Sequence, residues 1–331
     1  MSDDILEELA KHQGERLSLD HLVYLNDKAA KALAKYKGFL SIKGITSFFD
    51  SEGHTALAEK LANQNCDLFL DQITTLSDKA AMALANHQGI LSVRNLTNLD
   101  DSEGHTALAE KLAKQNIDLF PHHIKTLTTK PAEALARHSS KLFLNNLTKL
   151  DKATAKSLAK HKGILHLDGF SILRDDTLEE LAKHQGNYLS LAGLTCLSDK
   201  AAKALAKYKG FLSIRGITSF YDWEGHVALA NKIANQKGDL FLDALVILEK
   251  QPSKSLAKNQ GFLSLNRLSV ISDEVSEELA KHQGDYLSLA GLTSLSDKAT
   301  KALAKYSRSI YLEEKAKEIF IKSKLVIKSN L

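Results

Sequence analysis

One leucine pattern recurs along the whole chain and constrains its fold more than any other feature. The pattern is Leu-x-Leu-x-x-Leu-x-x-Leu followed by an alanine-rich stretch, and residues 189–210 show it as LSLAGLTCLSDKAAKALAKYKG. The copies follow one another at 23 or 24 residues, except for three intervals of 28 residues. A period in this range predicts a repeat protein whose units stack on one another. The copies begin at Leu17, Leu40, Leu68, Leu91, Leu119, Leu142, Leu165, Leu189, Leu212, Leu240, Leu263 and Leu287, with a degraded copy at Ile310.

Each repeat carries the signals of one strand and one helix. The Leu-x-Leu part alternates with period two, which predicts a short strand with one buried face. The alanine-rich part has apolar residues at helical spacing, as in Ala30, Leu33 and Ala34. Ser198 and Asp199 precede one such helix and are candidate N-caps. Glycines follow several helices and are expected to end them in the left-handed conformation: Gly38, Gly89, Gly163 and Gly210.

A strand joined through a helix to a parallel strand makes a right-handed crossover. We therefore predict an α/β fold, a right-handed curved solenoid of about thirteen repeats, with a parallel sheet on the concave side and helices on the convex side. Residues 1–16 are predicted to form an N-terminal capping helix, 17–309 the repeat array, and 310–331 a divergent C-terminal cap. The five extra residues in each of the three long repeats should lengthen the helices and leave the strand register unchanged.

The pattern resembles the leucine-rich repeat, and most closely the cysteine-containing subtype of F-box-type proteins. Leu197-Ser198-Asp199 stands where that subtype has its Ile-Thr-Asp step. The Asn or Cys of the usual repeat is replaced by Leu or Ile, as at Ile45 and Ile73, so apolar packing is expected in place of a hydrogen-bonded ladder. The resemblance implies binding of a protein partner, usually on the concave sheet.

Composition excludes several other classes of protein. The net charge of the 331 residues is +4, which is too small to indicate a nucleic-acid partner. No stretch is long and apolar enough to predict a membrane span, and the acidic N-terminus does not resemble a signal peptide. Two separated cysteines, Cys66 and Cys196, predict neither a disulfide framework nor a zinc site. We expect a cytoplasmic protein, and secretion without a signal peptide would leave the same pattern.

Histidine is the most tempting candidate for chemistry. Three Glu-Gly-His segments at the start of the long helices contain His54, His105 and His226, and their acidic residues suit a helix N-terminus. Six further histidines share one position near the end of the helix, where each side chain can bond a nearby carbonyl group: His12, His87, His138, His161, His184 and His282. Tyr, Gln or Asn replaces them in other repeats, so we expect a structural role and no metal ion. Because no nucleophile with a paired base is found, the sequence predicts no catalytic residue, no cofactor and no enzyme.

Aromatic residues at outward strand positions are the candidate binding residues. They alternate with the buried leucines and are expected to face the concave side, where exposed aromatics favour a protein interface. The alternative is that they pack on one another across strands and only stabilise the sheet. The candidates are Phe39, Phe69, Phe120, Phe143, Tyr188, Phe211, Phe241, Phe262 and Tyr286.

The sequence thus predicts a non-enzymatic protein-interaction module that binds its partner on the concave face. The sequence does not give the oligomeric state, and we favour a monomer. One alternative is a bacterial effector or adaptor, secreted without a signal peptide, that presents a target to an enzyme held elsewhere. Such a protein needs a recruiting segment outside the repeats, and only 310–331 is available.

Overall fold

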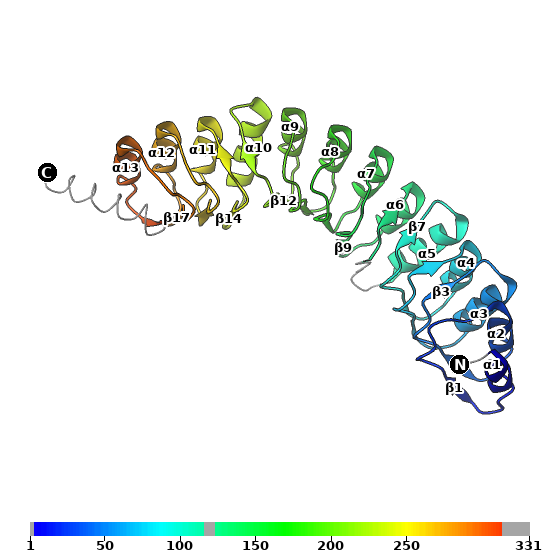
Figure 1. Cartoon of the computed structure of the whole chain (residues 1–331). Coiled ribbons are helices and arrows are strands. Elements are labelled where there is room, and N and C mark those ends of the chain that lie inside the picture. Colours follow the sequence, from blue (N-terminus) through cyan, green and yellow to red (C-terminus); the bar gives the residue numbers. More distant parts are fainter. Residues whose placement is uncertain (1–2, 116–122, 313–331) are drawn as a thin grey trace. The chain divides into compact units, whose positions relative to one another are not determined.

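The computed structural model of the chain describes residues 3–115 and 123–312, and these alternate between short helices and short parallel strands (Figure 1). They fall into two compact units. Unit 1 comprises the described residues up to His166 together with His184–Gly186, and unit 2 comprises Leu167–Lys183 and the described residues from Asn187 onward. None of the described helices is long and apolar enough to cross a membrane. The succession of similar strand–helix units fits a repeat solenoid.

The helices pack side by side in chain order within each unit. Unit 1 contains α1 (Asp3–Leu9), α2 (Asp27–Ala34), α3 (Glu52–Ala62), α4 (Asp78–Ala85), α5 (Glu103–Lys114), α6 (Thr129–Leu135) and α7 (Lys152–Leu158). Unit 2 contains α8 (Asp175–Leu181), α9 (Asp199–Leu205), α10 (Glu224–Ala234), α11 (Lys250–Leu256), α12 (Asp273–Leu279) and α13 (Asp297–Leu303). Within residues 1–16 the structure has the helix α1, and its role as a cap stays a prediction; most of the predicted C-terminal cap lies outside the described residues.

Polar residues start the helices as expected. The side chain of Ser198 accepts a hydrogen bond from the N–H group of Ala201, which caps α9. The expectation that glycines end the helices in the left-handed conformation is wrong, because among the described residues only Gly238 has a positive φ. At Gly163 the reason for glycine is space: a Cβ atom there would lie 1.9 Å from the carbonyl oxygen of Ser140 in the preceding repeat. Close packing between repeats selects this glycine.

One strand per repeat forms the expected parallel pairs. The strands are β1 (Arg16–Ser18), β2 (Phe39–Ser41), β4 (Leu68–Phe69), β6 (Leu91–Ser92), β9 (Leu142–Phe143) and β10 (Ile164–His166) in unit 1. Those of unit 2 are β11 (Tyr188–Ser190), β12 (Phe211–Ser213), β14 (Leu240–Phe241), β16 (Leu263–Ser264), β17 (Tyr286–Ser288) and β18 (Ser309–Tyr311). Paired strands align leucine with leucine, as Leu17 with Leu40 and Leu189 with Leu212. The Leu-x-Leu phase therefore predicts the register within each pair correctly.

The core lies between these strands and the helices. Leu40 and Leu189 of the strands and Leu33 and Leu205 of the helices are at most 1% exposed. Ile45, which stands where the leucine-rich repeat has Asn or Cys, is completely buried, so apolar packing does replace that position. Each repeat covers its apolar side chains only by packing on its neighbours.

A second set of strands was not predicted. These two-residue strands are β3 (Ser47–Phe48), β5 (Thr75–Leu76), β7 (Asn98–Leu99), β8 (Thr126–Leu127), β13 (Ser219–Phe220) and β15 (Ile247–Leu248), and they pair in parallel as β3–β5, β7–β8 and β13–β15. A threonine ladder runs beside them. Thr74 and Thr97 each donate both the backbone N–H and the Oγ1 hydroxyl to the carbonyl at the same position of the preceding repeat. A hydrogen-bonded ladder thus exists one residue after the apolar position.

The long repeats interrupt the first set of strands. Their helices, α3, α5 and α10, have 11 or 12 residues, as the insertions predicted. The expectation of an unbroken register is wrong, however, because β2 does not pair with β4, nor β12 with β14. The corresponding position at Leu119 lies outside the described residues.

A glutamine amide takes the place of the missing strand. The Oε1 atom of Gln64 accepts from the N–H of Leu40 at 2.6 Å, and its Nε2 donates to the carbonyl of Leu40 at 3.0 Å. Gln115 binds Leu91 and Gln236 binds Leu212 in the same way. Buried backbone groups left without partners are costly, so the glutamine compensates for the interruption.

We predict that Gln64→Ala lowers the free energy of unfolding by about 2 kcal/mol, because it leaves the buried N–H and C=O of Leu40 without partners. Chemical denaturation measures the loss. Gln72→Ala, at an exposed glutamine of the same unit, is the control and should change stability by less than about 0.5 kcal/mol. Equal losses in the two variants would contradict the role given to Gln64.

Candidate functional site

The candidate aromatic residues lie on the outward side of the strands, which we call the sheet face. In unit 2 these residues are Tyr188, Phe211, Phe241, Phe262 and Tyr286, and they flank the buried leucines of their strands. Phe211 is 38% exposed and Tyr286 is 58% exposed, whereas Leu212 beside Phe211 is 2% exposed. Strand alternation therefore places these rings outside the core, as the sequence predicted.

The rings of unit 2 also contact one another across strands. The rings of Tyr188 and Phe211 are parallel, with their centres 5.4 Å apart. Phe262 lies edge-on to Phe241 at 5.5 Å and edge-on to Tyr286 at 6.4 Å. Aromatic pairs of this geometry add roughly 0.5–1.5 kcal/mol to stability. The row thus contains both stabilising contacts and exposed ring surface.

The candidates of unit 1 are more scattered. Phe69 is 42% exposed, and Phe39 is half-buried beneath the guanidinium carbon of Arg16, which lies 4.9 Å from the ring centre. Phe143 stacks on His166 at 4.5 Å. Phe120 lies outside the described residues.

Arginine side chains also lie on the sheet face, and the sequence did not indicate this. The guanidinium carbon of Arg215 lies 5.5 Å from the ring centre of Phe241, as Arg16 lies over Phe39. Both are cation–π contacts. Because each joins residues of neighbouring repeats, no local motif reveals it.

The serines beside the aromatics are buried and bonded to the preceding repeat. Ser190 and Ser288 are both 3% exposed, and their hydroxyls donate to Asp168 and to Asn266 of the preceding repeat. Ser41 donates likewise to Asp20. Burial alone would raise the pKa of Asp20, but hydrogen bonds from Ser41 and from the N–H of Lys43 outweigh it and hold this pKa below its usual value. These serines are structural.

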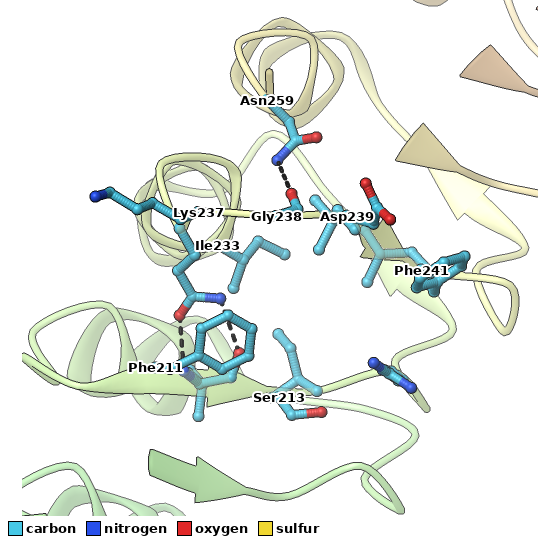
Figure 2. A pocket seen from close by; sticks show the side chains of 14 residues that line it. Phe211, Ser213, Ile233, Lys237, Gly238, Asp239, Phe241 and Asn259 are labelled. Atoms are coloured by element: carbon cyan, nitrogen blue, oxygen red, sulfur yellow. Dashed lines mark hydrogen bonds between the residues drawn. The ribbon is translucent and has the colours of Figure 1, made fainter. Parts of the chain in front are cut away.

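A narrow gap divides the row where β12 and β14 fail to pair. Figure 2 shows Phe211 and Phe241 on separate strands at this gap, which Ile233 of α10 also lines. The Gln236 amide bonded to Leu212 closes part of it, and the side chain of Asn259 donates to the carbonyl of Gly238. The space left holds about one water molecule. The gap is therefore too small for a substrate, and a partner can contact only its rim.

The Glu-Gly-His segments have a structural explanation. In α10 the N–H of Gly225 donates to Oδ1 of Asp199 at 2.6 Å, and a Cβ atom on Gly225 would lie 2.0 Å from the carbonyl oxygen of Asp199. The ring of His226 accepts from the N–H of Tyr221 through Nδ1 and contacts the carbonyl of Leu197 through Nε2. His54 and His105 make the corresponding bonds in the other two copies.

Three histidines of the second column make the carbonyl contact that the sequence predicted. His87, His138 and His161 each place Nδ1 within 3.4 Å of a carbonyl at the end of the preceding helix. The described residues hold no group of three His, Cys, Asp or Glu side chains arranged to bind a metal ion. The two cysteines, Cys66 and Cys196, are free thiols.

Comparisons with known proteins give no sequence match and a weak likeness to a solved structure. No protein-family model matches the chain, and no curated protein matches it. The chain is similar to a solved structure described as the Rad7 and Elc1 complex in yeast, with 14% sequence identity and a TM-score of 0.35 over 96% of this chain and 81% of that chain. At this TM-score the likeness supports no conclusion about fold or function.

Burial of His161 predicts a dependence of stability on pH. Burial lowers the pKa of His161 below its usual value of 6.5, against opposing hydrogen bonds from backbone groups. His184 stacks on it at 6.0 Å, and the nearby charge of His138 acts in the same direction as burial. A histidine whose pKa is lower in the folded state than in the unfolded state takes up its proton more readily after unfolding. The free energy of unfolding is therefore highest above pH 6.5 and falls as the pH drops from 6.5 through the folded pKa.

We predict that His161→Asn flattens the fall in unfolding free energy below pH 6.5, by up to about 1.4 kcal/mol per pH unit for one proton. Asn is the matched replacement because Asn259 occupies this position in another repeat and binds the equivalent carbonyl of Ala234. Denaturation curves between pH 5 and pH 8 measure the slope. His21→Asn, at an exposed histidine, should keep the wild-type slope, and an unchanged slope in His161→Asn would show the interpretation to be wrong.

Proposed function

We propose that the chain is a leucine-rich repeat protein that binds a protein partner through its sheet face and performs no catalysis. The repeating strand–helix units, the leucine-to-leucine register and the buried apolar position at Ile45 support this family. We further propose a monomeric, cytoplasmic protein. The alternative, an adaptor or effector that recruits through 310–331, stays a prediction, because 313–331 lie outside the described residues.

The observation that carries the proposal is the row of aromatic residues in unit 2. Phe211 and Tyr286 keep more than a third of their surface exposed even after contacting their neighbours. Exposed aromatic side chains next to arginine are the residue types enriched at the energetic centres of protein interfaces. Arg215 beside Phe241 completes this composition.

The aromatic row has a second interpretation, as a ladder that only stabilises the sheet. The two interpretations differ in what the exposed ring surface does. A ladder needs only the faces that touch neighbouring rings, whereas a binding row also needs the exposed faces of Phe211 and Tyr286. Binding and stability must therefore be measured on the same variants.

We predict that Phe211→Ala weakens capture of the partner by on the order of 2 kcal/mol and destabilises the fold by less, because the ring lies outside the leucine core. Affinity and melting temperature are measured on the same preparation. Partners are first captured with the wild-type chain, and the affinity of each is then measured for the wild-type chain and for Phe211→Ala.

Lys301→Ala, on helix α13, is the matched control and should retain the partner. A large loss of stability in Phe211→Ala with unchanged capture would assign the aromatic row to the fold alone. Partner binding would then have to lie on the helices or in 310–331.

A further inference from the structure

The Asp-x-Glu-Gly-His segment of one long repeat departs from the other two copies at its second residue. Residues 50–54 and 101–105 both read DSEGH, whereas residues 222–226 read DWEGH. Ser51 and Ser102 are N-caps whose side chains accept a hydrogen bond from the helix. Trp223 occupies the same position in α10 and makes no capping bond. Losing such a cap lowers helix stability, so folding alone gives no reason for Trp223.

Trp223 belongs to an aromatic cluster on the loop between β13 and α10. Its ring lies 4.6 Å from that of Tyr221 and 5.0 Å from that of His226. Trp223 is 48% exposed and Tyr221 is half-buried, whereas His226 beneath them is buried. The cluster therefore presents a tryptophan and a tyrosine ring to solvent on a fixed base.

Two carboxylates lie beside this cluster, and neither forms a salt bridge with Lys or Arg among the described residues. Asp222 stands between the two rings in sequence, and its N–H donates to Glu249 at 2.5 Å. Oδ1 of Asp222 accepts a hydrogen bond from the backbone N–H of Gln251. The other nearby acid, Glu224, is already paired with Lys203 at 2.8 Å. Asp222 and Glu249 thus leave negative charge next to exposed aromatic faces.

Apolar side chains extend the surface on the next repeat. Val246 and Ile247 are both 44% exposed, and Ile247 lies on β15, which pairs with β13 through Ser219. Glu249 is the residue that follows the end of β15. Aromatic rings, unpaired carboxylates and branched apolar side chains therefore share one stretch of surface.

We propose that Tyr221, Trp223, Asp222 and Glu249 form a binding site for a lysine or arginine side chain on an apolar segment of a partner protein. A cation over the face of Trp or Tyr is attracted by the ring, and the two carboxylates complement its charge. Val246 and Ile247 contact the apolar residues that flank the cation. This site is separate from the sheet-face row and does not depend on it.

The chain carries its own reporter for this site, because Trp223 is its only tryptophan. The probe is the capped peptide Gly-Leu-Arg-Leu-Gly, and the matched probe replaces Arg with citrulline, which keeps the shape and removes the charge. We expect a saturable change in the fluorescence of Trp223. Half-saturation should need about tenfold less Arg peptide than citrulline peptide, and added salt should weaken the binding of the Arg peptide. Equal binding of the two peptides, or no saturable change with either, overturns the proposal.

Two variants separate recognition from folding. Asp222→Asn combined with Glu249→Gln should bind the Arg peptide no better than wild type binds the citrulline peptide. Trp223→Ser recreates the sequence of the other two copies, so it should restore the cap, keep or raise the melting temperature, and lose Arg-peptide binding measured by calorimetry. If either variant binds the Arg peptide as tightly as the wild type does, the substituted residues do not form the site.

Discussion

Hydrogen bonding and apolar packing between successive repeats are the interactions on which the rest of this structure depends. A single strand of three residues and a helix of seven cannot bury their own leucines, so each repeat is completed by its neighbours. The requirement is strict for the backbone as well, because a buried N–H or C=O must find a partner. Where a longer helix separates two strands, the amides of Gln64, Gln115 and Gln236 supply the partner that the next strand would have supplied.

The sequence predicts those features that a single repeat already contains. The Leu-x-Leu alternation gave the strands and the register of Leu17 with Leu40, and the polar residue before each helix gave caps such as Ser198. Features that exist only between repeats were missed or misread. Nothing in the sequence distinguishes Gln64 from the other polar residues at the same repeat position, although it binds Leu40. The sequence predicts that Gly163 ends a helix, whereas the carbonyl of Ser140 leaves no room for a side chain there. The two-residue strands, such as Ser47–Phe48, are too short to show any alternation.

The candidate site shows the same division. Strand alternation correctly placed Phe211 and Tyr286 outside the core, because that depends only on local backbone geometry. It could not show that Arg215 lies over Phe241, or that serines of the sheet face donate to Asp and Asn side chains of the preceding repeat. The sheet face is thus more polar and more rigidly bonded than its sequence suggests. Its aromatic rings combine mutual contact with exposed surface, so stability and recognition overlap there.

Amide hydrogen exchange of the chain alone and with its captured partner tests the sheet-face assignment most directly. Backbone amides of the strands report on that face, and those of α8 to α13 report on the helices. We predict that the partner slows exchange in β11, β12, β14, β16 and β17 and leaves the helices of unit 2 unchanged. Slowing confined to the helices, with the strands unaffected, would contradict binding through the sheet face.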